Sequence, residues 1–295
     1  MKQYINPNII VSILSIYICS CGFFKSDKYS NDIYIENLST RTKTKITHTG
    51  MNSSPVYLHK CNCILFHHIP SINDYPRLKI LNIDKNTIID FISDNKSRLT
   101  PSVDSSDSIV IYTSFNDKKR ELWQYSIKSK TDRLLVKSIK QGLEASPYIS
   151  HDGKFVLYIN EDDNELYILD IIKNTSKRMT FSNNFIYYPQ YPKWLPNSKE
   201  IVFLSFGFLR IVNLKGNIVY SFPLDGLAGF RNIIVDPHKS DLIYLKAQPA
   251  SDTSYIYNLY EISINTNSIR MILSKRPYYE LSYDFSPNGE YLVHD

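Results

Sequence analysis

The sequence lacks the short motifs that mark several common enzyme classes. It contains no Gly-x-Ser-x-Gly and no His-Glu-x-x-His, so neither a hydrolase nucleophile nor a zinc-protease helix is visible. The apolar run Ile9–Ile18 is about half of the roughly 20 residues that a membrane-spanning helix needs. The formal charge is only +5 and the basic residues are scattered, so we expect no nucleic-acid partner.

Glycine is also scarce, at 9 of 295 residues, whereas the chain has 23 Tyr and 14 Phe. A chain of this length is about right for one large all-β domain. Its core is large enough to need no metal or disulfide for stability. Tyrosine suits packing between sheets, because the ring is buried while the hydroxyl reaches a partner or water.

The stretch Ser146–Phe181 predicts one four-stranded meander. Its expected strands are Pro147–Ser150, Phe155–Ile159, Glu165–Ile171 and Ser176–Phe181. Turn residues separate them, and the Asp-Gly pair of the first turn suits the positive φ of a tight hairpin. Because one such sheet cannot bury both of its faces, we expect further copies along the chain.

The copies recur with a period in the forties. Four leading prolines stand 46, 46 and 45 residues apart, at Pro55, Pro101, Pro147 and Pro192. A degenerate copy covers Ile234–Pro237, and a last one covers Tyr283–Gly289. Four strands per repeat at this period are the signature of β-propeller blades.

The two ends of the chain predict one shared blade. Tyr283–Ser286 and Glu290–Val293 supply only two strands after the fifth blade, while Asp32–Leu38 and Lys43–His48 match the third and fourth strands of a blade. Pairing them in one sheet closes the ring and removes a free edge. The predicted fold is therefore an all-β, six-bladed propeller with four-stranded antiparallel blades and a last blade built from both ends.

The blade pattern resembles the repeat of TolB-type propellers. That pattern, Ser-Pro-aromatic-x-Ser-x-Asp/Asn-Gly, stands closest in Ser146–Leu157 and Ser282–Val293, and more weakly in Tyr191–Val202. The resemblance covers essentially residues 32–295 and implies six blades. TolB has an additional N-terminal α/β domain for which this sequence has no room, so its role in the Tol–Pal system is not carried over.

The sequence Ile18-Cys19-Ser20-Cys21 resembles the lipobox of bacterial lipoproteins. The resemblance implies cleavage between Ser20 and Cys21 and lipid chains on Cys21. We expect a signal peptide at 1–20, a lipidated tether at 21–31 and the propeller at 32–295. Gly22, in place of Asp, favours the periplasmic face of the outer membrane over the inner membrane. An ordinary secretory signal with a chance cysteine is the alternative.

Two cysteines and three histidines lie within His59–His68 and could ligate a metal. A strand rises about 3.3 Å per residue, so one ion cannot reach both ends of this segment. His59, Cys61 and Cys63 remain weak candidates. Two unpaired cysteines and turn histidines are the favoured interpretation, since a Cys61–Cys63 disulfide is awkward across one residue of extended chain.

Residues just after each leading proline enter the innermost strand, next to the central channel. They are Tyr57, Val103, Tyr148 and Trp194, with Asp284 and Phe285 in the composite blade. An aromatic mouth would suit a peptide or a sugar. The alternative, which we favour, is that some of these side chains simply pack between blades.

The absence of a catalytic motif favours a non-catalytic protein- or peptide-binding module of the cell envelope, anchored by lipid on Cys21 and needing no cofactor. The alternative is a polysaccharide-active enzyme, because TolB-like propellers also resemble oligogalacturonate lyases, which use histidines and a divalent metal. That alternative requires several of the seven histidines to converge on the channel. A prolyl-peptidase propeller is a third hypothesis, but it lacks the hydrolase domain.

Overall fold

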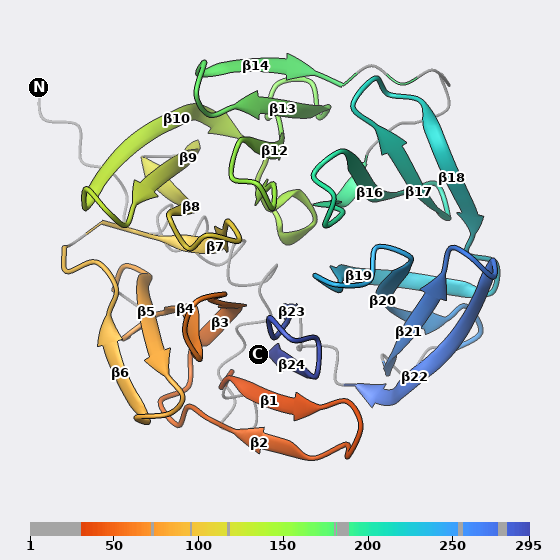
Figure 1. The fold of residues 1–295 in the computed structure, drawn as a ribbon, viewed down its shortest axis with the longest axis horizontal. Coiled ribbons are helices and arrows are strands. Elements are labelled where there is room, and N and C mark those ends of the chain that lie inside the picture. Colours follow the sequence, from red (N-terminus) through yellow and green to blue (C-terminus); the bar gives the residue numbers. More distant parts are fainter. Residues whose placement is uncertain are drawn as a thin grey trace, which may run out of the picture.

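The structure is a computed structural model that describes residues 31–71, 74–94, 96–116, 119–179, 181, 189–252, 256–276 and 282–295. Within these residues the chain forms six four-stranded antiparallel sheets arranged as blades around one axis (Figure 1). The all-β six-bladed propeller predicted from the repeats is confirmed. Only one short 3₁₀ helix, η1 (Leu143–Ala145), interrupts the strands of the described part.

The first three complete blades follow one another along the chain, each from its innermost to its outermost strand. Blade one consists of β3 (Asn52–Tyr57), β4 (Cys63–His68), β5 (Arg77–Asn82) and β6 (Thr87–Asp90). Blade two consists of β7 (Leu99–Val103), β8 (Ile109–Asn116), β9 (Lys119–Ser126) and β10 (Thr131–Ile139). Blade three consists of β11 (Tyr148–Ile149), β12 (Phe155–Ile159), β13 (Leu166–Asp170) and β14 (Thr175–Arg178).

Blades four to six complete the ring. Blade four consists of β15 (Gln190–Trp194), β16 (Glu200–Ser205), β17 (Phe208–Asn213) and β18 (Ile218–Pro223). Blade five consists of β19 (Leu227–Val235), β20 (Leu242–Pro249), β21 (Tyr257–Ser263) and β22 (Ser268–Arg276). Blade six consists of β23 (Tyr283–Phe285), β24 (Tyr291–His294), β1 (Tyr34–Asn37) and β2 (Lys43–Lys45).

The sixth blade joins the two ends of the chain, as the sequence predicts. Its strand order is β2-β1-β24-β23, and Figure 1 shows β1 and β2 beside β23 and β24. The central pair is antiparallel, with Ile35 opposite Val293 and Glu36 opposite Leu292. This pairing gives both strands a hydrogen-bonding partner and closes the ring.

Apolar side chains fill the six spaces between neighbouring blades. One cluster joins blades three and four through Leu157, Trp194 and Phe203, and another joins blades six and one through Val293 and Tyr57. The remaining four clusters join the other neighbours in the same way. Burial of large apolar side chains at about 25 cal/mol per Å² is the main term that holds the ring together.

The glycines of the Asp/Asn-Gly turns allow adjacent blades to approach each other. Gly153 has φ +72°, and a Cβ there would lie 3.2 Å from the Asp104 carboxylate of the preceding blade. Gly289 of the sixth blade abuts Asp236 of the fifth in the same way. Both the positive φ and the close contact favour glycine at these two positions.

The six innermost strands all run in the same direction along the channel. Their first residues line one end of the channel and their last residues line the other. We call the end near the strand starts the entry face and the opposite end the exit face. Because the strands alternate in direction, the connections between second and third strands also lie on the entry face.

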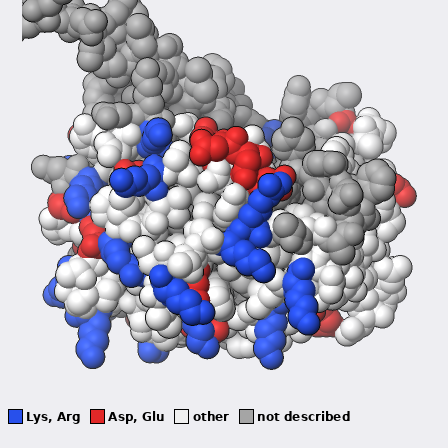
Figure 2. Space-filling view, turned by 90° about the horizontal axis from the view of Figure 1, so that it is seen from above, with Lys and Arg blue, Asp and Glu red and all other residues white. Residues whose placement is uncertain are grey.

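The described chain begins on the entry face, since Asn52, at the start of β3, donates its backbone N–H to the Asn31 carbonyl at 2.8 Å. No described helix is long and apolar enough to span a bilayer. On the side that Figure 2 shows, Lys and Arg side chains are spread over the surface among acidic groups, without forming one basic patch.

Candidate functional site

The central channel contains two chambers that meet at a constriction. Strand starts line the entry chamber, a cavity of about 70 Å³, and strand ends line the exit chamber. Val56, Tyr148 and Asp284 border both chambers, so they form the layer between them. These residues come from blades one, three and six, which places the constriction on the propeller axis.

The rim of the entry chamber is built from strained backbone. Ser54, Thr100 and Tyr191 each precede a leading proline and have φ values of 53°, 45° and 53°. Residues before proline favour extended backbone, and bulky residues with positive φ are rare. In each of these blades the register with the second strand also shifts at this point, as in a β-bulge. Strain of this kind gathers at functional sites, which makes the rim a candidate binding site.

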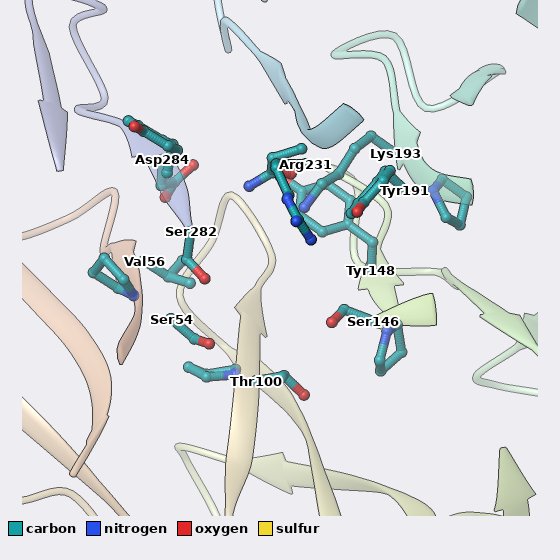
Figure 3. A pocket seen from close by; sticks show the side chains of 16 residues that line it. Ser54, Val56, Thr100, Ser146, Tyr148, Tyr191, Lys193, Arg231, Ser282 and Asp284 are labelled. Carbon is teal, nitrogen blue, oxygen red and sulfur yellow. The ribbon is translucent and has the colours of Figure 1, made fainter. Parts of the chain in front are cut away.

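Lys193 extends from the start of blade four into the entry chamber (Figure 3). Its ammonium lies 4.0 Å from the centroid of the Tyr148 ring. Desolvation by the surrounding blades lowers the pKa of Lys193 to about 8, and the Asp284 carboxylate partly opposes that shift. The lysine therefore remains mostly protonated at neutral pH and close to its titration range.

Asp284 lies at the constriction and accepts a hydrogen bond from the Tyr57 backbone N–H at 2.9 Å. Burial raises the pKa of Asp284 to about 6, although the Tyr57 N–H and the nearby Lys193 favour the charged form. Desolvation is the larger effect because the carboxylate is surrounded by the blades. Asp284 and Lys193 influence each other's pKa, but among the described residues they form no ion pair.

Arg231 and Ser54 complete the polar lining of the entry chamber. Arg231 donates from Nε to the Tyr257 hydroxyl at 3.1 Å, and its guanidinium lies 5.5 Å from that ring. The Ser54 hydroxyl is buried and makes no hydrogen bond within the described residues. A buried hydroxyl without a hydrogen-bond partner is unusual and indicates that a water or a ligand forms the missing hydrogen bond.

The exit chamber is lined by two histidines, His59 and His151. His59 and His151 meet edge to face with ring centroids 5.4 Å apart, although they belong to blades one and three. Burial lowers the pKa of His151, and His59 and His238 add to that effect. His238, in the corresponding turn of blade five, makes a hydrogen-bond contact with the Pro287 carbonyl oxygen.

The structure distributes the predicted channel residues over three environments. Tyr148 and Asp284 border both chambers, while Val103, Trp194 and Phe285 border only the exit chamber. Trp194 also packs between blades three and four and donates its indole N–H to the Tyr148 carbonyl at 3.2 Å. Tyr57 borders neither chamber and packs between blades six and one.

The prediction that Cys61 and Cys63 are unpaired is wrong, because the structure joins them in a disulfide. The geometric objection assumed extended backbone. The Cys63 N–H instead donates to the Cys61 carbonyl at 2.8 Å, and this tight turn brings the two Cα atoms to 5.3 Å. Both sulfurs are then engaged, so they are not available with His59 as thiolate ligands.

The described residues do not fit a divalent metal. No three side chains among their His, Cys, Asp and Glu residues are arranged to hold one. His67 is fully buried, and burial lowers its pKa to about 3. His294 of the sixth blade contacts Arg276 of the fifth blade at 3.0 Å. The predicted lipidation and cleavage residues, Ser20 and Cys21, lie outside the described part of the chain.

Three aromatic side chains are exposed in the described part of the chain, and all three lie on the entry face. Tyr75 stands between β4 and β5 and is 65% exposed. Phe206 lies in the tight turn between β16 and β17 and is 65% exposed, and Phe208, the first residue of β17, is 37% exposed. The sequence did not indicate that the exposed aromatic side chains lie on one face of the propeller, because this depends on which strand ends and connections the fold brings to that face.

No protein-family model matches the sequence, and no curated protein matches it significantly. Solved structures do resemble the chain. The TolB-type protein of Agrobacterium tumefaciens has a TM-score of 0.68 at 15% identity, over 90% of this chain and 97% of the other. TolB of Acinetobacter baumannii has a TM-score of 0.60 at 15% identity, over 91% and 69%.

An oligogalacturonate lyase in complex with manganese has a TM-score of 0.61 at 10% identity, over 89% of this chain and 82% of the other. Identities this low carry information on the fold alone. The comparisons and the sheet topology agree on one conclusion, that the chain folds as a TolB-like six-bladed β-propeller.

Proposed function

We propose that this protein is a lipid-anchored, non-catalytic binding module of the bacterial cell envelope that holds a segment of a protein partner at its entry face. The observation that carries the proposal is that the exposed aromatic side chains of the described residues lie on that face, in blades one and four. Tyr75, Phe206 and Phe208 are the exposed aromatics of the described residues, and the entry chamber opens on the same face.

Phe206 supports this proposal through its backbone as well as its exposure. It occupies the first central position of a two-residue turn, with φ 48°, and Gly207 follows with φ 74°. Asn or Asp is preferred at such a position, and a bulky residue there costs on the order of 1 kcal/mol. An exposed aromatic side chain at this position is consistent with contact with a partner protein, because aromatic residues are enriched in interfaces.

The lipobox-like sequence supports anchoring on this same side of the propeller. Asn31 lies on the entry face, and the tether 21–31, eleven residues counting both ends, links it to the lipid on Cys21. An extended chain of that length reaches roughly 35–40 Å. Two or more acyl chains hold a protein stably on a membrane, so the entry face would stay close to the membrane that carries the partner.

Replacing Cys21 by Ala tests the anchor. We expect Cys21→Ala to move the protein from the membrane fraction to the soluble fraction, and a partner crosslinked to wild type in native membranes to be lost or strongly reduced. Fractionation by immunoblot and a crosslinking pull-down followed by mass spectrometry measure both. A variant that stays in the membrane fraction would contradict the lipidation of Cys21.

Replacing Phe206 by Ser tests the binding face. We expect the affinity for the recovered partner to fall about 5- to 10-fold or more, because truncating one interface aromatic removes more than about 1 kcal/mol. Ile172→Ser is the matched control, since Ile172 is 80% exposed in a turn on the exit face. Equal losses in both variants, or a loss in the control alone, would rule out the entry face as the interface.

The polysaccharide-enzyme alternative makes a different prediction in the same preparations. A lyase similar to the manganese-containing neighbour would bind a divalent cation stoichiometrically and shorten polygalacturonate. Calorimetry with Mn²⁺ and chromatography of the polymer measure the two properties. Their joint appearance, without a protein partner in the pull-down, would replace the binding-module proposal.

A further inference from the structure

Among the described residues, the entry chamber contains a lysine, Lys193, that makes no ion pair, although the Asp284 carboxylate acts on it from a longer distance. We infer that the chamber recognises a carboxylate on the bound peptide, either an Asp or Glu side chain or a chain terminus, with Lys193 and Arg231 as its cationic contacts. The inference rests on the proposed function and specifies which part of the partner enters the channel.

Lys193 is the main contact. Among the described residues its ammonium has no hydrogen-bond acceptor and no ion pair. It lies 4.0 Å from the centroid of the Tyr148 ring, and the Asp284 carboxylate acts on it from a longer distance. Removing an ammonium from water is unfavourable unless it is paired. Stacking on an aromatic ring offsets only part of that cost, at roughly 0.5–2 kcal/mol. A ligand carboxylate in the chamber would complete the pairing.

Arg231 provides the second contact from the neighbouring blade. Its hydrogen bond to the Tyr257 hydroxyl fixes the guanidinium against that ring. Figure 3 shows Arg231 and Lys193 both reaching into the chamber, and both residues line the cavity. A guanidinium presents a planar set of donors that matches the two oxygens of a carboxylate, which adds direction to the charge attraction.

The other side chains that line the entry chamber also favour binding of an anion. Among the described residues that line the entry chamber, Lys193, Arg231 and Asp284 are the charged ones, so their summed charge is positive even when Asp284 is ionised. Asp284 is already engaged by the Tyr57 N–H. The buried Ser54 hydroxyl has no partner within the described chain and can donate to an oxygen of the ligand.

The cavity volume distinguishes a peptide from a sugar polymer. About 70 Å³ is far below the roughly 300–1,000 Å³ of typical small-molecule sites. A single side chain or a chain end fits into that space, whereas a pyranose ring with its neighbours does not. An acidic peptide is therefore the favoured source of the carboxylate, and a uronate is the competing one.

Two matched peptides test the inference in the full-length protein. The probes are N-acetyl-Ala-Glu-Ala-amide and the same peptide with Gln, with galacturonate as a third ligand, and binding is followed by calorimetry or NMR titration. We expect the Glu peptide to bind at least tenfold more tightly than the Gln peptide. Lys193→Met should abolish that difference, while Lys154→Met, an exposed lysine of the exit-face turn in blade three, should preserve it.

Asp284→Asn should strengthen binding of the Glu peptide, because it removes the competing negative charge while Asn still accepts from the Tyr57 N–H. The wild-type affinity should fall as the pH rises through about 8, where Lys193 loses its proton. It should rise as the pH falls through about 6, where Asp284 becomes neutral. Tyr148, Tyr191, Arg231 and His59 also face this chamber or Asp284, so the same titration on Lys193→Met isolates the lysine.

The outcomes separate this inference from the proposed function. Equal affinity for the Glu and Gln peptides, with a partner still recovered by crosslinking, would overturn carboxylate recognition alone. Lys193-dependent binding of the Glu peptide without any recovered partner would support the carboxylate site and overturn the envelope partner. Lys193-dependent binding of galacturonate but not of the Glu peptide would overturn the peptide ligand.

Discussion

Replacing Val293 by Asp should remove most of the stability of the propeller, with an expected loss of at least about 4 kcal/mol. Val293 is fully buried in β24, pairs with Ile35 of β1 and packs against the cluster between blades six and one. An unpaired carboxylate there is costly to bury, and the apolar contacts are lost as well. A domain has only about 5–15 kcal/mol of stability in total, so this one change approaches the whole amount.

Thr44→Asp is the matched control, because Thr44 is exposed in β2 of the same blade and lies opposite Ile35 on its other side. We expect it to change the unfolding free energy by less than about 0.5 kcal/mol. Urea unfolding followed by circular dichroism measures both variants. If Val293→Asp unfolds at the wild-type midpoint, the ring does not depend on the pairing of the two chain ends.

The number and closure of the blades could be predicted because the relevant signals are local. The proline spacing and the Asp/Asn-Gly turns repeat once per blade, and the two unmatched strands at each end fit one another. Turn chemistry of this kind acts within a few residues, so it is readable from the sequence. The strand Phe155–Ile159 was predicted with its observed bounds.

The channel lining was harder to predict because adjacent side chains of a strand point in opposite directions. The residue directly after the leading proline faces the channel in four blades, as Val56, Ser102, Tyr148 and Lys193. Choosing aromatic residues instead selected Tyr57 and Trp194, one position further along. Tyr148 directly follows Pro147, and choosing the same position after Pro192 would have identified Lys193.

Arg231 had no comparable signal in the sequence. Blade five lacks the leading proline, and its first strand shifts register between Ala228 and Asn232. The position of Arg231 in the chamber therefore depends on a bulge and on packing against Tyr257, neither of which a repeat pattern reports. Contacts between blades, such as His59 with His151, are likewise set by tertiary structure.

Removing both carboxylates around Arg98 should have the second large effect on stability. Arg98 is almost fully buried where the chain passes from blade one to blade two. Its guanidinium pairs with Asp94 through both oxygens and with Asp132 at 2.8 Å, and it stacks on Tyr112. In the Asp94→Ala, Asp132→Ala double variant this charge stays buried without an anion, which typically costs about 3–5 kcal/mol.

A third substitution distinguishes this mechanism from simple loss of contacts. Adding Arg98→Met to the double variant removes the unpaired charge, so the triple variant should regain at least about 1 kcal/mol. If the triple variant is less stable than the double, Arg98 contributes mainly by packing, and the buried-charge explanation is wrong. Guanidinium chloride would screen the ion pairs, so urea unfolding is the appropriate measurement.

The same cluster predicts a component of the acid sensitivity. The hydrogen bond from Arg98 holds the pKa of Asp94 below its ordinary value of 3.8. A lowered native pKa means that the unfolded chain binds the proton more readily, so stability from this group is present above about pH 4. It is lost as the pH falls through the native pKa. The unfolding free energy of wild type should therefore decrease more steeply below pH 4 than that of Asp94→Ala, because the variant lacks this proton-linked contribution.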